Sequence, residues 1–121
     1  MMKSPGFRKS FIFAIKGIVL AWKQERNFRT QLVIAAIVVT FSVLLAIPLS
    51  HTIVAVAMIG LVMTAEMMNT AFEELCDKFY PEHDPHIGRI KDLAAGAVLI
   101  ASITAAIVGI AIFAPAIIAL V

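Results

Sequence analysis

Hydrophobic and polar positions divide the chain into four segments. Three long apolar runs, at 32–47, 53–72 and 93–121, are separated from one another by short polar stretches. With the residues at their ends, runs of this length approach the ~20 apolar residues that a membrane-spanning helix needs. We therefore predict spans at 30–49, 52–75 and 93–121, with a short turn after the first and a loop at 76–92 after the second.

The first segment, residues 1–29, has a different pattern. Large apolar side chains recur there at helical spacing, at Phe7, Phe11, Ile15, Ile18 and Trp22. Lysines recur every seven residues on another face, at Lys9, Lys16 and Lys23. This pattern predicts an amphipathic helix on the membrane surface, with its lysines towards headgroups and cytosol. An anchor without any chemical role remains an equal alternative.

Composition and charge agree with this division. The chain of 121 residues is 61% hydrophobic, above the apolar share of an ordinary soluble domain. Its ten Lys and Arg residues fall in two groups, seven at 3–29 and three at 78–91. By the positive-inside rule, the N-terminus and the 76–92 loop are cytoplasmic. We predict an all-α polytopic membrane protein with a single domain over 1–121.

Small residues follow one face of the third span at four-residue intervals, at Ala97, Ala101, Ala105 and Gly109. Such a face lets helices approach closely in lipid. Three helices enclose little space, so a polar site would also need neighbouring chains. We therefore expect a homo-oligomer.

Polar residues form a row within the second span. Glu66, Asn69, Glu73 and Asp77 share one helix face, and Glu66 and Glu73 lie roughly 10 Å apart along the axis. The row runs from inside the bilayer to its cytoplasmic surface. Because an ionisable residue in a span costs at least ~2.5 kcal/mol on insertion, Glu66 predicts a functional site. A carboxyl group kept for packing is the alternative.

Further charged groups reach the same surface. Glu25 precedes the first span, and Lys91 precedes the third, where free N–H groups at a helix start favour an anion. Carboxylates beside phosphate-binding donors suggest Mg²⁺ with a nucleotide. Phosphoryl transfer needs charge neutralisation and a base for the attacking hydroxyl, and Glu66 is the deepest carboxylate.

Other interpretations remain open at this point. Carboxylates beside basic residues also occur as structural ion pairs. The sequence has no Walker-type phosphate loop and no protein kinase signature. An oligomeric proton-conducting protein that uses Glu66, or a structural subunit of a larger complex, are the alternatives. His83 and His86 match no zinc spacing and are explained by a proline-bearing turn.

Three stretches resemble the prokaryotic diacylglycerol kinase family, which includes the undecaprenol kinases. They are Glu66-Met-Met-Asn69-Thr-Ala-Phe-Glu73, the stretch from Gly88-Arg-Ile-Lys91-Asp92 to Leu99, and Glu25-Arg-Asn-Phe-Arg29. The resemblance implies a homotrimer with active sites between subunits, in the bacterial inner membrane, with the N-terminus and active site cytoplasmic. It also implies ATP as phosphoryl donor, a lipid alcohol as acceptor and no nucleic acid as partner.

The same resemblance implies a role for each matching residue. Glu66 is then the base, Glu25 and Glu73 are the Mg²⁺ ligands, and Lys91 contacts phosphate. Asn69, Asp77 and Asp92 line this site, and Gly88 belongs to the nucleotide-binding stretch. The acceptor is diacylglycerol or undecaprenol. Glu25–Arg29 and 91–96 are more similar to the undecaprenol kinase branch, which gives a weak preference for undecaprenol.

Overall fold

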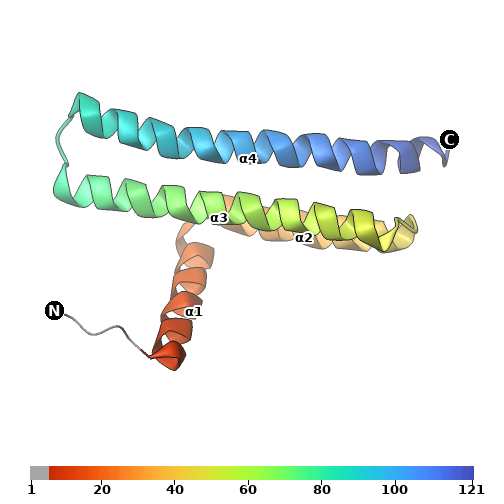
Figure 1. Ribbon diagram of the computed structural model, residues 1–121, viewed down its shortest axis with the longest axis horizontal. Coiled ribbons are helices and arrows are strands. Elements are labelled where there is room, and N and C mark those ends of the chain that lie inside the picture. The colour runs from red at the N-terminus through yellow and green to blue at the C-terminus, as the bar shows by residue number, and fades with distance from the viewer. Residues whose placement is uncertain (1–5) are drawn as a thin grey trace.

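The computed structural model describes residues 6–121, and these residues form four α-helices and no strand. The helices are α1 (Phe7–Gln24), α2 (Arg26–Leu44), α3 (Leu49–Phe79) and α4 (Pro85–Ile118). Figure 1 shows α2, α3 and α4 side by side along the long axis, with α1 crossing them at a steep angle. The expected surface helix at 1–29 therefore appears as α1, and its first five residues lie outside the described part.

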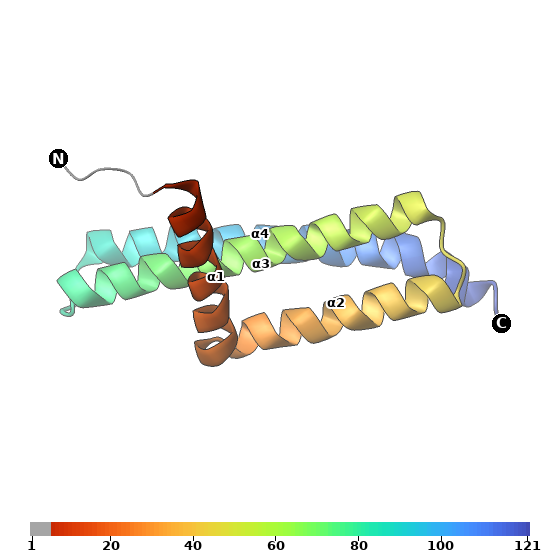
Figure 2. The ribbon, with the colours of Figure 1, turned by 90° about the horizontal axis from the view of Figure 1, so that it is seen from below.

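Three of the four helices, α2, α3 and α4, are long and apolar enough to cross a membrane. The all-α, three-span architecture predicted from the sequence is thereby confirmed. At 1.5 Å per residue, α2 is about 28 Å long, whereas α3 and α4 are about 46 and 51 Å. Figure 2 shows that α3 and α4 continue past the start of α2 towards their own connection. Because the bilayer core is about 30 Å thick, part of α3 and α4 extends beyond it.

The crosswise helix α1 exposes its apolar side chains. Phe7, Phe11 and Trp22 are all exposed, and Ala21 is the one buried residue of this helix. The lysine face lies opposite, with the Lys16 ammonium 5.9 Å from the Phe13 ring centre. An exposed apolar stripe opposite a basic stripe is the pattern of a helix that lies in the membrane interface.

A single residue, Glu25, separates α1 from α2. It has an extended backbone, with φ −108° and ψ 106°, and its N–H still donates to the Ala21 carbonyl at 2.8 Å. From α2, the Arg29 Nη1 donates to the carbonyls of Trp22 at 2.7 Å and Lys23 at 3.2 Å. We call this joint the elbow. It turns the chain sharply without a loop.

The turn between α2 and α3 ends the first span. The N–H of Ile47 bonds to the Ser42 carbonyl at 2.9 Å, and the N–H of Ala46 bonds to the Val43 carbonyl at 3.2 Å. These two bonds form a Schellman motif, which requires a left-handed residue at its centre. Ala46 occupies that position with φ 52°, where glycine is the usual residue.

The connection between α3 and α4 is shorter than predicted. The predicted loop covers 76–92, whereas α3 continues to Phe79 and α4 begins at Pro85. Asp84 is the N-cap, and its Oδ1 accepts from the N–H groups of His86 at 2.8 Å and Ile87 at 3.2 Å. Asp84 and Pro85 favour a helix start, so the charged residues that follow are helical.

The most extensive helix contact is between α3 and α4. Ala55, Ile59 and Val62 of α3 are buried, as is Ala101 of α4. Ala105 and Gly109 face a hollow of about 290 Å³ among α2, α3 and α4, whereas Ala97 is exposed. The small-residue face therefore serves close helix packing around Ala101, as its spacing predicts.

Candidate active site

A cavity of about 190 Å³ lies where α1, α2 and α3 meet. Most of its wall is apolar, and its carboxylates are Glu25, Glu66 and Glu74. Its lining residues are Gly17, Leu20, Ala21, Gln24, Glu25, Phe28, Glu66, Met67, Thr70, Ala71 and Glu74. Such a cavity, apolar with a few convergent polar groups, is the usual form of a small-molecule site.

Glu66 is half-buried on α3 at this cavity. The charges of Glu25 and Glu73 act on its carboxyl group, as does the side chain of Asn27. Glu25 lies close to Glu66 because it is the single residue that joins α1 to α2, and no loop separates these two helices. The structure thus places Glu25 of the elbow and Glu66 of α3 on one cavity, whereas Glu73 lies about two turns along α3 outside its lining.

The polar row on α3 has the arrangement that its spacing predicts. Asn69 Nδ2 donates to Glu73 Oε1 at 3.4 Å, one helical turn further on. The other amide atom, Asn69 Oδ1, is buried and has no hydrogen-bond partner among the described residues. An orphaned buried acceptor is uncommon in proteins and therefore marks a place where a donor or a cation would be favourable.

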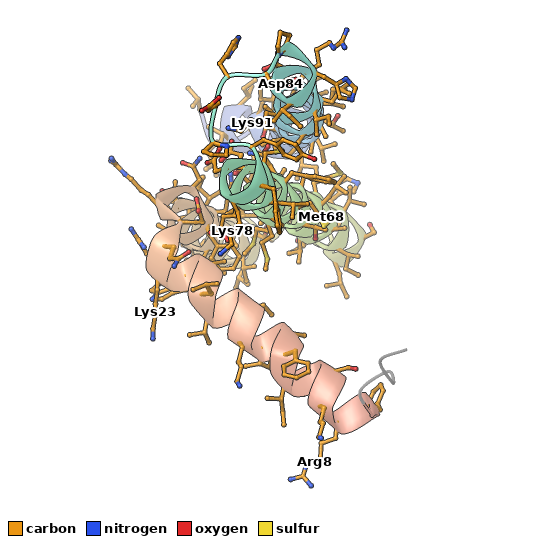
Figure 3. The ribbon with its side chains drawn as sticks, turned by 90° about the vertical axis from the view of Figure 1, so that its left-hand side faces the viewer. Arg8, Lys23, Met68, Lys78, Asp84 and Lys91 are labelled. Atoms are coloured by element: carbon orange, nitrogen blue, oxygen red, sulfur yellow. The ribbon has the colours of Figure 1, made fainter. Side chains whose placement is uncertain are left out.

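At the charged end, the Lys91 Nζ lies 2.6 Å from Asp77 Oδ1, and this contact joins α4 to α3. Figure 3 shows Lys91 between these two helices, with Asp84 further out on α4. The expectation that Lys91 stands beside free N–H groups at a helix start is wrong. Helix α4 starts at Pro85 and Asp84 takes up its first N–H groups, so Lys91 lies in the second turn.

Of the predicted site residues, only Glu25 and Glu66 line the cavity. Asn69, Glu73 and Asp77 continue the polar row, Lys91 contacts Asp77, and Asp92 and Gly88 lie elsewhere on α4. Asp92 is exposed, in a shallow depression on α4 with Arg89 and Leu93. Gly88 lies one turn before Lys91, and a Cβ atom there would meet nothing within 4 Å. Its surroundings are open, and no close backbone approach requires glycine.

Sequence reasoning missed three residues of this region. Glu74 falls off the polar row, yet it lines the cavity because the cavity opens on the neighbouring face of α3. Asn27 and Arg29 both lie in the Glu25–Arg29 stretch, which was used only for the resemblance. Asn27 stands two positions after Glu25, a spacing that places no two side chains on one helix face, and the bond from Arg29 back to α1 has no signature in the sequence either.

The oxygen ligands available here fit a magnesium ion. Among residues 6–121 no group of three or more His, Cys, Asp or Glu side chains could hold a metal alone. Magnesium is typically held by one or two carboxylates together with substrate phosphates, so a closed protein cage is not required. Glu25 and Glu73 would supply the carboxylates, and the unpartnered Asn69 Oδ1 lies beside Glu73.

Fold and site together define a small helical membrane protein with a carboxylate-rich cavity near the charged ends of its spans. The family model of prokaryotic diacylglycerol kinase matches residues 12–113. The chain belongs to this family and is thus a membrane lipid kinase. The resemblance drawn from the three stretches is confirmed.

Individual relatives divide between two substrates. The undecaprenol kinase of Bacillus subtilis is 33% identical over 109 residues, which cover 90% of this chain and 89% of that protein. The diacylglycerol kinase of Synechocystis is 35% identical over 118 residues, which cover 97% of this chain and 67% of that protein. The diacylglycerol kinase of Escherichia coli K12 is 33% identical over 95 residues, 78% of each chain.

Proposed function

We propose that this lipid kinase transfers the γ-phosphoryl group of Mg-ATP to the hydroxyl group of a lipid alcohol. The hydroxyl oxygen forms the new bond to phosphorus while the bond from phosphorus to the oxygen of ADP breaks. The hydroxyl proton passes to the Glu66 carboxylate. The products are a lipid phosphate, which stays in the membrane, and ADP, which leaves to the cytosol.

The observation that carries the proposal is the position of Glu66 in a largely apolar cavity beside Glu25. An apolar wall accepts the hydrocarbon next to a lipid hydroxyl, and a carboxylate within that wall accepts a proton. Phosphoryl transfer requires little covalent chemistry from the protein beyond such positioning and charge stabilisation. The carboxylate row from Glu66 to Asp77 then connects the lipid side to the aqueous side.

The remaining residues are proposed to bind the nucleotide at the aqueous side. Lys91 would exchange its contact with Asp77 for a phosphate oxygen, since an ammonium group binds either anion. Asn69 would hold Glu73 in place. Asp92 and Gly88, which lie on more open faces of α4, would contact the outer part of the nucleotide.

Glu25 and Glu73 would hold Mg²⁺, with Asn69 Oδ1 as a neighbouring oxygen. When bound, the ion would offset the negative charge of the phosphates. Glu25 lies at the elbow and Glu73 on α3, so their separation depends on how the elbow packs against α3. In the described residues, neither takes part in an ion pair that would compete for its oxygens.

For the acceptor we propose a long-chain lipid alcohol, with undecaprenol preferred over diacylglycerol on the resemblance of Glu25–Arg29 and 91–96. We further propose a homotrimer in the bacterial inner membrane, with its active sites on the cytoplasmic side. The clustering of all Lys and Arg residues at one end of the spans supports this orientation. Contributions from neighbouring chains would complete the open faces around Asp92.

The test is phosphorylation in mixed micelles that contain Mg-ATP and either undecaprenol or diacylglycerol. We expect Glu66→Gln to lose nearly all turnover because the amide cannot accept the proton, while the protein stays folded. Glu74→Gln is the matched control, since this carboxylate lines the same cavity but lies off the polar row. Near-normal turnover of Glu66→Gln would remove Glu66 as the base.

A wild-type protein that is folded but phosphorylates neither lipid would contradict the proposed acceptors. Proton flux in proteoliposomes that disappears in Glu66→Gln, without ATP consumption, would instead support proton conduction.

A further inference from the structure

Helix α1 is attached to the rest of the chain mainly through the elbow. Its most extensive contacts with another helix are those with α2. Nearly all of its residues are exposed, and Ala21, close to the elbow, is its buried one. A helix attached at one end can change its angle unless something fixes the joint.

Arg29 supplies such a fixation. The last carbonyls of any helix lack intrahelical partners, and those of α1 include Trp22 and Lys23. The Arg29 guanidinium bonds both, at 2.7 and 3.2 Å, from the first turn of the next helix. A cation at a helix C-terminus is also favoured by the helix dipole. One planar group therefore connects two helices across the elbow.

The angle of α1 determines the shape of the cavity. Gly17, Leu20 and Ala21 of α1 form one wall, and Met67 and Ala71 of α3 form the facing wall. Leu20 lies about 7.5 Å along α1 from Glu25, so a small change of angle at the elbow moves this wall appreciably.

We propose that Arg29 is a positioning residue that holds α1 across the cavity and so determines how well the lipid alcohol binds. The proposal rests on the lipid kinase function proposed above. Arg29 is absent from the cavity lining, and it acts on the substrate only through α1. Its effect falls on lipid binding, because Lys91 and Asp77, on the proposed nucleotide side, belong to α4 and α3 and pair with each other.

Both bonds come from Arg29 Nη1, which the planar guanidinium holds in one place, so the geometry of arginine matters here as well as its charge. A guanidinium presents several N–H donors in a fixed plane, whereas an ammonium group is a point charge on a flexible stem. Arg29→Lys keeps the charge and the helix but loses the rigid double contact. We therefore expect an intermediate phenotype for Arg29→Lys and a stronger one for Arg29→Ala.

The kinetic test measures kcat and both KM values for wild type, Arg29→Ala and Arg29→Lys in mixed micelles. We expect the lipid KM of Arg29→Ala to rise by roughly tenfold, with the ATP KM unchanged. Arg26→Ala is the matched control, since Arg26 is exposed, also lies in the first turn of α2 and has no side-chain bond among the described residues. A loss confined to kcat, or an equal effect of Arg26→Ala, would overturn the proposal.

A distance measurement tests, without any substrate, whether the Arg29 contact fixes the angle of α1 at the elbow. Spin labels at Ile12→Cys on α1 and Val43→Cys on α2, in a Cys76→Ala background, report the angle at the elbow. Labelled chains are diluted with unlabelled ones so that only distances within a chain are read. We expect a narrow distribution in wild type, a broad one in Arg29→Ala and an intermediate one in Arg29→Lys.

Identical distance distributions in all three proteins would show that Arg29 does not hold α1 and would overturn the proposal. If the distance distributions broaden in the Arg29 variants but the wild-type protein phosphorylates no lipid, the role of Arg29 in holding α1 is supported and the proposed function is contradicted. The two proposals are thus tested separately.

Discussion

The two joints at the charged ends of the spans, α1–α2 and α3–α4, differ in length and in what holds them. The elbow between α1 and α2 has one non-helical residue, and a side chain from α2 holds it. The α3–α4 connection spans five residues, is capped by Asp84, and is followed by the Asp77–Lys91 contact between two helices that run beyond the bilayer core. The elbow positions Glu25 beside Glu66, whereas the second joint positions Lys91 further out.

This difference shows how a small chain can place some residues at the membrane surface and others in the aqueous phase. Under the proposed function, the group that contacts the lipid would need a fixed place near the membrane surface, and the one-residue elbow would provide it. The groups that contact a soluble nucleotide would need to lie outside the bilayer, and the extension of α3 and α4 would provide that. A chain with loops at both joints would lose the first property.

The largest effect we expect at the second joint comes from Lys91→Gln. Hydrogen bonds to charged groups contribute about 1.5–3 kcal/mol, so the ATP KM should rise by about one to two orders of magnitude. The lipid KM should stay the same. The exchanged pair, Asp77→Lys with Lys91→Asp, keeps an ion pair but moves the cation to α3, and recovery of activity in it would show that Lys91 serves only as an ion-pair partner.

At the elbow, Glu25→Gln should raise the Mg²⁺ concentration needed for half-maximal turnover by at least about tenfold, since even indirect partners of a metal cost that much. The titration is run at fixed ATP in mixed micelles. Excess Mg²⁺ should restore part of the activity. An unchanged Mg²⁺ requirement would mean that Glu25 does not hold the metal, and Glu74→Gln serves as the control carboxylate.

A smaller effect is expected from Asp84→Ala at the α3–α4 joint. Loss of an N-cap typically costs about 1 kcal/mol, because two N–H groups of α4 lose their acceptor. The free energy of unfolding is measured by denaturant titration in detergent micelles. Asp84→Asn should retain most of the stability, and a full loss in both variants would indicate that the charge rather than the cap is needed.

The smallest effect concerns the turn between α2 and α3, which contains none of the proposed site residues. Ala46 has φ 52°, a conformation that costs a non-glycine residue about 1–2 kcal/mol. Ala46→Gly should therefore raise the free energy of unfolding, by up to about 1 kcal/mol after the greater freedom of glycine in the unfolded chain is subtracted. Activity should not change. A destabilised variant would contradict the left-handed assignment.

Much of the fold could be predicted because it depends on patterns within single helices. Apolar length gave the three spans, and opposite stripes of lysine and large apolar residues gave α1. Helical periodicity also placed Glu66, Asn69 and Glu73 on one face, and the Asn69–Glu73 bond agrees with it. Such features need only the geometry of one helix.

The rest depends on relations between helices or on local competition. The 76–92 stretch was taken as a loop because it is charged, although Asp84 and Pro85 together favour a helix start. The Arg29 bonds to Trp22 and Lys23 exist only because α1 turns back at the elbow. A cavity formed by three helices has no sequence signature, so the position of Glu74 in its lining could not be predicted.

The crosswise orientation of α1 also bears on bilayers of different thickness. A helix that lies in the interface keeps its depth by its own amphipathic balance, whereas spans respond to hydrophobic mismatch mainly by tilting. Since Glu25 is the first residue after α1, its depth in the membrane would follow that of α1 and would change little as the spans tilt. Kinase activity should accordingly vary little with the acyl-chain length of the host bilayer, because the elbow would keep the proposed site at a constant depth below the headgroups.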